Sequence, residues 1–316
     1  MIPIEWVYLA AERIKDHIFQ TPVTFDDELN IYLKWENKQV TGSFKIRGAL
    51  NKVFCLENWE LNQGLVTASA GNHGQGVALS GKIVGTPVTI FASDHTVPTK
   101  IEAMRILGAE VCLVNGGYDI AEQTALEFAN QKNATYISPY NDGQIIAGQG
   151  TIGLEVIEKL ADDNKFTWIS PVGGGGLISG IGAVIRHFKK PHRLVGVQSD
   201  ASPFTYSLYH HGTQSNITDL PSLADGLSGP MQTGSITLPM LKNLVDDIIT
   251  VNEVDIAQGI AYAWHKYHEV IEGSSATAIA AVLTGKIKSP AVLIMSGGNI
   301  QPEIHDQICQ KFAEIV

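Results

Sequence analysis

The segment TGSFKIRG, residues 41–48, decides how the rest of this 316-residue chain is interpreted. After it, the apolar residues at positions 46, 49, 50, 53 and 54 follow the spacing of one helix face. Ser43 is the expected N-cap, which places Lys45 in the first helical turn. A charged ammonium is disfavoured there, because a helix N-terminus carries partial positive charge. A lysine that loses its charge by forming an imine avoids that cost. Taken alone, however, this segment favours the simpler interpretation of a surface lysine near a helix start.

Strands and helices alternate along the chain, which predicts parallel sheets. The expected strands are residues 31–36, 65–68, 88–91, 111–114, 136–138, 166–170, 193–197, 247–251 and 291–295. The expected helices are residues 5–18, 77–80, 98–107, 119–130 with Asp119 as N-cap, 150–160, 177–188, 253–268 and 274–283. Residues 206–239 have less periodicity and are expected to be rich in loops. The pattern predicts an α/β fold of two parallel-sheet lobes with flanking helices.

Three further motifs each follow an expected strand: SAGNHGQG at residues 69–76, GGGGL at residues 173–177 and SGGN at residues 296–299. Open α/β sheets bind ligands at the carboxyl ends of their strands. We therefore expect the four motifs to meet at one site.

In this order and spacing, the four motifs resemble the serine/threonine dehydratase and serine racemase family. These are fold-type II pyridoxal-phosphate enzymes of the tryptophan synthase beta-like superfamily. The resemblance extends from about residue 21 to the C-terminus. It implies a small domain of residues 64–140, inserted in a large domain formed by residues 1–63 and 141–316. It also implies an active site in the cleft between the lobes, where Lys45 holds pyridoxal 5'-phosphate covalently beside Phe44.

The composition of the glycine loop itself indicates an anion-binding site, apart from the resemblance. Four consecutive glycines let the backbone approach an anion closely, and the helix that follows adds favourable potential. A dinucleotide fingerprint requires G-x-G-x-x-G/A, but the frames here end in Ile178 or Ser179. Asp200, an acidic residue after a later expected strand, keeps a dinucleotide site open as an alternative, and a tight turn without ligand is another. We favour a phosphate, and the resemblance assigns the cofactor phosphate to Gly173, Gly174, Gly175, Gly176 and Leu177.

The resemblance gives further residues a role toward the cofactor or the substrate. Asn72 would bind the 3'-oxygen of the cofactor, although it could instead cap a helix. Ser296 would face the pyridine nitrogen, although an ordinary Ser-Gly-Gly turn is the alternative for this motif alone. The remaining cofactor residues would be Gly226 and Glu272. The backbone of Ser69, Ala70, Gly71, Asn72 and His73 would bind the substrate carboxylate, with His73 itself more structural than catalytic.

Two positions separate the activities found in this family. Serine racemases carry a serine where this chain has Ala70, and a methyl group cannot transfer the second proton that racemisation needs. Family members with a divalent-cation site carry a glutamate and an aspartate where this chain has Gln198 and Phe204. These residues offer a hard cation too few anionic oxygens, so we expect no metal there.

We therefore expect elimination of water and deamination of L-threonine and L-serine to 2-oxobutanoate and pyruvate, with Lys45 as the base. The segment Glu272-Gly-Ser-Ser departs from the usual Glu-Pro-Ala-Gly of the family, which keeps a related lyase for another β-substituted amino acid open. A serine racemase and a non-catalytic binding protein are further alternatives.

Composition limits the partners. A net charge of −10 disfavours nucleic acid and anionic membranes, so a small amino acid is the expected partner. The three cysteines have no metal-ligand spacing, and the N-terminus resembles neither a signal peptide nor a membrane span. We expect a cytoplasmic protein, and the family resemblance implies a homodimer.

Overall fold

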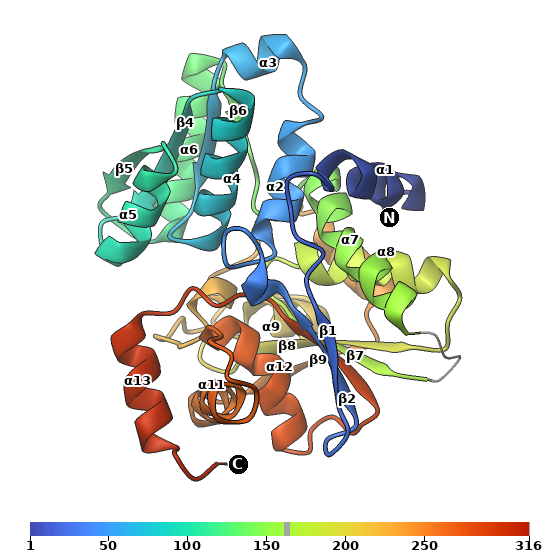
Figure 1. Cartoon of the computed structure of the whole chain (residues 1–316). Coiled ribbons are helices and arrows are strands. Elements are labelled where there is room, and N and C mark those ends of the chain that lie inside the picture. Colours follow the sequence, from blue (N-terminus) through green and yellow to red (C-terminus); the bar gives the residue numbers. More distant parts are fainter. Residues whose placement is uncertain (161–164, 316) are drawn as a thin grey trace.

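In the computed structural model, which describes residues 1–160 and 165–315, the strands form two separate sheets flanked by helices (Figure 1). The larger sheet has the order β1-β2-β10-β7-β8-β9. Its strands are β1 (Val23–Asp26), β2 (Ile31–Trp35), β7 (Thr167–Pro171), β8 (Arg193–Ser199), β9 (Asp247–Val251) and β10 (Ala291–Met295). Only the edge strand β1 is antiparallel to its neighbour, and the other pairs are parallel.

The smaller sheet is wholly parallel and has the order β5-β4-β3-β6. Its strands are β3 (Leu65–Ala68), β4 (Val88–Ser93), β5 (Glu110–Val114) and β6 (Thr135–Tyr136). All of them fall within one continuous stretch of chain, whereas the larger sheet takes strands from both ends of it. The α/β fold with parallel sheets and flanking helices is therefore confirmed, and the domain boundaries at residues 64 and 140 stay a prediction.

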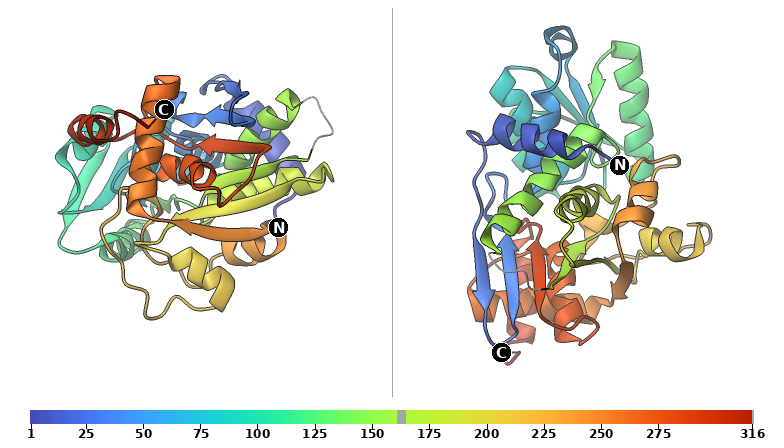
Figure 2. Two further views of the ribbon diagram at one scale, coloured as in Figure 1. Left: turned by 90° about the horizontal axis from the view of Figure 1, so that it is seen from below. Right: turned by 90° about the vertical axis from the view of Figure 1, so that its right-hand side faces the viewer.

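Helices cover both faces of each sheet (Figures 1 and 2). Those of the larger sheet are α1 (Ile4–Ile14), α7 (Gly143–Lys159), α8 (Gly176–His187), α9 (Phe204–His211), α10 (Thr237–Leu244), α11 (Glu253–Tyr267), α12 (Gly273–Leu283) and α13 (Pro302–Lys311). Those of the smaller sheet are α3 (Asn58–Asn62), α4 (Asn72–Val84), α5 (Pro98–Ile106) and α6 (Tyr118–Lys132). Helix α2 (Lys45–Val53) contacts both α4 and α7, so it joins the two halves.

Residue burial explains these layers. Strand β10 is apolar and buried along its whole length, as expected for a central parallel strand covered on both faces. In β3, Leu65 packs in the cluster with α2, α4 and α5, whereas the next residue, Val66, packs against α6. Successive strand residues point to opposite faces, so the side chains of this short strand alternate between two cores.

Several local predictions need correction. The N-cap of α2 is Phe44, and the hydroxyl of Ser43 is buried without a hydrogen-bond partner in the described residues. Helix α6 begins at Tyr118 with Gly117 as its N-cap, so Asp119 lies within the first turn. Residues 206–239 are largely irregular, as expected, between the end of α9 and the start of α10, and the short 3-10 helix η2 (Asp225–Leu227) lies among them. Strand β1 and helices α3 and α13 were not expected.

No helix in the described ranges combines the length and the apolar character that crossing a bilayer requires.

Candidate active site

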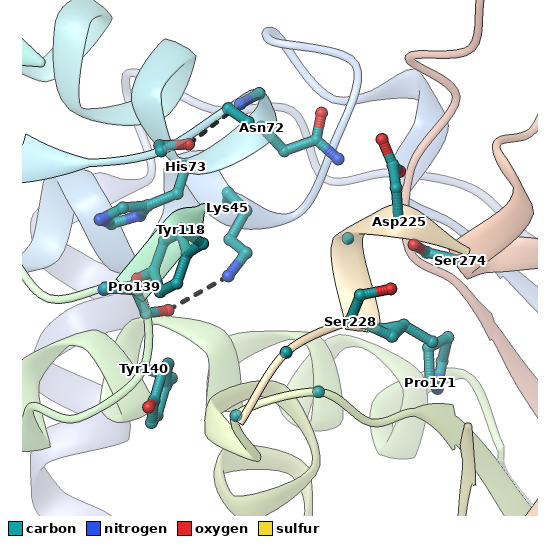
Figure 3. Close-up of a pocket in the computed structure, with 18 of the residues that line it drawn as sticks. Lys45, Asn72, His73, Tyr118, Pro139, Tyr140, Pro171, Asp225, Ser228 and Ser274 are labelled. Carbon is teal, nitrogen blue, oxygen red and sulfur yellow. Dashed lines mark hydrogen bonds between the residues drawn. The ribbon is translucent and has the colours of Figure 1, made fainter. Parts of the chain in front are cut away.

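A cavity of about 290 Å³ lies between loops that follow β3, β7 and β10 (Figure 3). It brings together every residue that the sequence assigned to the site: Phe44, Lys45, Ser69, Ala70, Gly71, Asn72, His73, Gly173, Gly174, Gly175, Gly176, Leu177, Gly226, Glu272 and Ser296. They come from both sheets and from α2, because the carboxyl ends of these parallel strands face one another across the cavity. Their individual roles stay predictions.

Lys45 is the first residue of α2, and its amine points into the cavity (Figure 3). The backbone N–H of the preceding residue, Phe44, donates to the carbonyl of Ser296 at 3.0 Å, which ties the helix start to the end of β10. The Lys45 Nζ donates to the Pro139 carbonyl at 3.2 Å. Burial lowers its pKa to about 8, against the opposing effect of the Glu272 charge. A substantial fraction of the amine is therefore neutral, and nucleophilic, near physiological pH.

The glycine loop presents its N–H groups in a fixed direction. The carbonyl of Gly173 accepts a bond from Thr205 Oγ1 and that of Gly174 accepts one from Thr237 Oγ1, each at 2.7 Å. In a trans peptide the N–H points opposite to the C=O, so the next N–H groups point away from the two threonines. A Cβ on Gly174 would lie 2.3 Å from the Tyr140 ring, so no larger residue fits there. The loop therefore forms a close-fitting anion cradle at the N-terminus of α8.

Asn72 is the first residue of α4 and Gly71 is the N-cap, so the alternative that Asn72 caps the helix is wrong. Its Nδ2 donates to both carboxylate oxygens of Glu272, at 2.8 and 3.0 Å, and its Oδ1 accepts from Asn299 at 2.7 Å. Burial, followed by the negative charge of Asp225, raises the pKa of Glu272 to about 7. Asn72 is thus held firmly, by residues from two loops of the larger half.

The loop after β3 keeps only some of its N–H groups available. Ser69 donates its N–H to the Phe91 carbonyl, and its hydroxyl accepts from the N–H groups of Gly71 and Gly74. The N–H groups at the start of α4, those of Asn72 and His73, have no partner within the helix and can bind an anion. The N–H groups of Ser69 and Gly71 are thus already engaged within the protein, and the role of this loop toward a substrate carboxylate stays a prediction.

The ring of His73 is buried, and its Nε2 lies 3.0 Å from the Ile137 carbonyl. Burial, and then the charge of Lys45, lowers the pKa of His73 to about 3. The ring is neutral at physiological pH, which suits a structural side chain better than a general acid.

Gln198 has both ends of its amide engaged. Its Nε2 donates to the Leu227 carbonyl at 3.2 Å, and its Oε1 accepts from the Tyr206 N–H at 3.0 Å. In residues 1–160 and 165–315, no cluster of three His, Cys, Asp or Glu side chains could hold a metal ion. The sequence-based prediction about the metal is not tested by this finding.

Several residues that line the cavity were not expected from the sequence, among them Lys100, Tyr118, Tyr140, Asp225 and Ser274. Lys100 Nζ forms an ion pair with Asp225 Oδ2 at 2.5 Å, joining α5 of the smaller sheet to η2. Lys100 also lies in the first turn of its helix, which is the signal that singled out Lys45. The same reasoning from the sequence could therefore have identified Lys100.

Comparison with known proteins identifies the family of this chain. The model of the family "Pyridoxal-phosphate dependent enzyme" matches residues 14–297. The chain belongs to this family. It is accordingly a pyridoxal-phosphate-dependent enzyme, and the expected family and cofactor are confirmed.

Individual family members are similar over almost the whole chain. An L-threonine ammonia-lyase of Thermotoga maritima is 39% identical, with 98% of this chain and 79% of that protein covered. Threonine deaminase isoform 2 of Solanum lycopersicum, in its processed form, has a TM-score of 0.88 at 31% identity, covering 97% and 92% of the two chains. Maize serine racemase has a TM-score of 0.88 at 29% identity, covering 99% and 98%.

Proposed function

We propose that this enzyme deaminates L-threonine to 2-oxobutanoate and ammonia, and L-serine to pyruvate and ammonia. One observation carries the proposal: Lys45, whose pKa burial lowers to about 8, points into a cavity that also holds a glycine-rich anion cradle. The names of two of the relatives, a threonine ammonia-lyase and a threonine deaminase, support this reaction.

The residues present fit pyridoxal phosphate. Lys45 would hold it covalently, with Phe44 beside it, and the fixed N–H groups of the loop from Gly173 to Leu177 would bind its phosphate. Asn72 would donate to its 3'-oxygen and Ser296 to its ring nitrogen, while Gly226 and Glu272 would line its faces. When bound, the cofactor supplies an electron-withdrawing ring that makes the α-proton of an amino acid easier to remove.

The protein's own groups then have separate tasks. The N–H groups at the start of α4 orient the substrate carboxylate, which fixes the Cα–H bond toward the Lys45 side of the cavity. Lys45 Nζ removes the α-proton, and its lowered pKa suits a base that must be neutral before it acts. His73 is neutral and bonded to the Ile137 carbonyl, so it positions the loop.

Serine racemisation is the second candidate, and the likeness to maize serine racemase favours it. Ala70 opposes it, because its methyl group lines the cavity where a second proton donor would be required. Formation of D-serine from L-serine would favour the racemase, whereas ammonia without D-serine favours the lyase. A related lyase is distinguished by profiling ammonia release over a series of β-substituted amino acids.

The central experiment adds L-threonine to the purified enzyme and measures ammonia and 2-oxobutanoate in equal amounts. Borohydride reduction followed by peptide mapping should attach the cofactor at Lys45. Bound cofactor without ammonia from any amino acid would overturn the proposal and favour a binding protein. A cofactor tag at another residue would overturn the assignment of Lys45.

We also propose that residues 64–140 form a small domain within the large one, and that the enzyme is a cytoplasmic homodimer. The four strands of the smaller sheet, which lie between Leu65 and Tyr136, support the first point. Sedimentation equilibrium would test the dimer. The three free cysteines, Cys55, Cys112 and Cys309, support a reducing compartment, which fractionation of the source cells would test.

A further inference from the structure

Asn299 ends the fourth sequence motif, yet it is not among the described residues that line the cavity. Its Nδ2 donates to the Thr41 carbonyl at 2.9 Å and to Asn72 Oδ1 at 2.7 Å. Asn299 therefore joins the segment that carries Lys45 to the first residue of α4. The role proposed for Ser296 explains neither bond, so the last residue of the motif has a task of its own.

Backbone bonds fix the place of Asn299 beside the lysine segment. The Phe44 N–H donates to the Ser296 carbonyl at 3.0 Å. The Gly298 N–H donates to the Gly42 carbonyl at 2.9 Å. Gly42 has a φ of +68°, and a Cβ on it would lie 2.5 Å from Asn299 Oδ1. Glycine is therefore required at position 42 for its backbone conformation and for the space that the Asn299 amide occupies.

The hydrogen bonds around Asn72 can run in only one direction. The Thr41 carbonyl cannot donate, so Asn299 must turn its nitrogen to that carbonyl, and the same nitrogen donates to Asn72. Asn72 then turns its oxygen to Asn299 and its nitrogen to the opposite side. There the carboxylate of Glu272 accepts from that nitrogen at 2.8 and 3.0 Å. An acceptor at each end of the chain of bonds thus fixes the orientation of the Asn72 amide.

The nitrogen of Asn72 is consequently the end of the amide that a ligand in the cavity meets. Figure 3 shows this nitrogen turned toward the cavity and the oxygen turned away from it. An amide nitrogen has two hydrogens, so one can stay with Glu272 while the other turns to a ligand. In pyridoxal phosphate the aldehyde carbon and the 3'-oxygen are attached to adjacent ring atoms. Asn299, which bonds both segments, therefore holds Lys45 and Asn72 in register for these two atoms.

We propose that Asn299 is a positioning residue for the cofactor: it holds the Asn72 amide so that its nitrogen, and not its oxygen, faces the 3'-oxygen of pyridoxal phosphate. The proposal rests on the role proposed for Asn72 and extends it to a residue outside the cavity. With the amide reversed, an acceptor oxygen would face the negatively charged 3'-oxygen. The anionic form of the cofactor, which absorbs visible light, would then lose a donor and gain a repulsive neighbour.

The test measures the absorption spectrum of the holoenzyme at pH 8, where the ratio of visible to near-ultraviolet absorbance reports the ionisation of the 3'-oxygen. Asn299→Asp replaces the donor by an acceptor and should reverse the Asn72 amide. We expect the ratio to fall by about tenfold or more, the effect of losing a hydrogen bond to a charged group. Asn299→Ala removes the donor but leaves Glu272 to hold the amide, so the fall should be about threefold or less. Equal falls in the two variants would overturn the proposal.

A second measurement keeps the proposal falsifiable if the aspartate variant does not fold. In a Glu272→Gln background, the new amide at position 272 can donate or accept, so Asn299 alone fixes the direction of the bonds. Adding Asn299→Ala to this background should lower the ratio by about tenfold, against about threefold or less in the wild-type background. Falls of equal size in the two backgrounds would mean that Asn299 does not orient Asn72.

Asn243→Asp is the matched control, because Asn243 is an exposed residue of α10 whose side chain bonds the Pro239 carbonyl. It makes the same substitution and should leave the ratio unchanged. Asn72→Ala should lower the ratio as much as Asn299→Asp does. An unchanged ratio in Asn72→Ala would refute the role proposed for Asn72, and the positioning role with it. A fall in Asn72→Ala without one in Asn299→Asp would refute the positioning role alone.

The spectra are recorded without substrate, so they are independent of the reaction that the enzyme catalyses. Ammonia release from L-threonine by the wild type is assayed separately. Its absence would overturn the proposed function and leave the positioning role of Asn299 to be decided by the spectra.

Discussion

Lys34 and Lys45 are both enclosed by the protein, and burial lowers the pKa of each, but their surroundings differ. Lys34 Nζ lies 2.5 Å from Glu155 Oε2, 2.7 Å from the Thr21 carbonyl and 3.8 Å from Glu36 Oε1. Within the described residues, Lys45 Nζ has one hydrogen bond, to a backbone carbonyl, and it opens onto the cavity. A buried ammonium with carboxylate partners is a structural cation, whereas one without them readily becomes a neutral amine.

The two environments are neighbours on α2. Arg47, two residues after Lys45, donates to Glu36 from Nε and Nη2, at 2.7 and 2.8 Å, and to Glu155 from Nη1 at 2.6 Å. Its guanidinium is fully buried. The ionic cluster of Lys34, Glu36, Arg47 and Glu155 thus anchors the helix whose first residue must point into the cavity.

The largest expected effect is on catalysis. Lys45→Ala should lower threonine deamination by about 10³-fold or more, because both the covalent attachment and the base are lost. The melting temperature of the cofactor-free protein should not fall, since the variant removes a poorly solvated amine. Assays of 2-oxobutanoate and thermal unfolding measure the two effects. If this variant kept its activity, Lys45 would not be the reactive amine, and the contrast with the structural cation Lys34 would be wrong.

Breaking the ionic cluster should affect stability instead. Glu36→Gln leaves buried Arg47 and Lys34 with one carboxylate fewer, and removing one partner of a buried ion pair costs about 3–5 kcal/mol. Urea unfolding measures the loss. The control is Glu12→Gln, because the ion pair of Glu12 with Lys15 is exposed and should contribute little to the free energy of unfolding. Equal losses in the free energy of unfolding would mean that the buried cluster stabilises the protein no more than an exposed ion pair does.

The buried carboxylates Glu36 and Glu272 differ in the same way as the two lysines. Cations hold the pKa of buried Glu36 below its usual value, whereas burial raises that of Glu272 to about 7. A carboxyl group with a raised folded-state pKa costs stability above that pKa and no longer does so below its unfolded value.

Glu272→Gln should therefore stabilise the cofactor-free protein by about 3 kcal/mol at pH 8, and by much less at pH 5. Urea unfolding at both pH values measures this difference, and the new amide can still accept a bond from Asn72. If the variant were less stable than the wild type at pH 8, the interpretation that the charged form of Glu272 destabilises the folded protein would be wrong.

The smallest expected effect is a pH dependence. With the pKa of Lys45 at about 8, the rate at which cofactor-free enzyme binds pyridoxal phosphate covalently should rise about tenfold from pH 7 to pH 9 and then level off. An ordinary lysine would give a rise of about 100-fold with no plateau below pH 10. Stopped-flow absorbance measures the rate, with titration of the cofactor itself as the control.

The sequence predicted those parts of the site that lie within short motifs. The motifs follow strands, so the chain direction brings Lys45, Asn72, the glycines and Ser296 to the carboxyl ends of the two sheets, which face each other across the cavity. Lys100 was not predicted as part of the cavity, because it belongs to no motif. The ionic cluster was missed for a related reason: Lys34 and Glu155 are 121 positions apart, and no periodicity links them.

One of the two incorrect helix caps, at Ser43, has an identifiable physical cause. Ser43 and Asp119 are side chains that favour an N-cap, yet the caps are Phe44 and Gly117. Ser43 pairs with Gly297 in an isolated β-bridge, so tertiary contact with the end of β10 fixes its backbone. Local preference cannot anticipate a partner that comes 254 positions later.

The threonine hydroxyls behind the glycine loop have one more consequence. Thr205 and Thr237 hold two peptide groups of the flexible glycine loop in place. The loop therefore loses its conformational entropy during folding and not when a ligand binds. A phosphate that arrives later meets a rigid receptor. Serine in their place would keep the orientation, whereas valine would make the loop adjust during each encounter and would weaken retention of the cofactor.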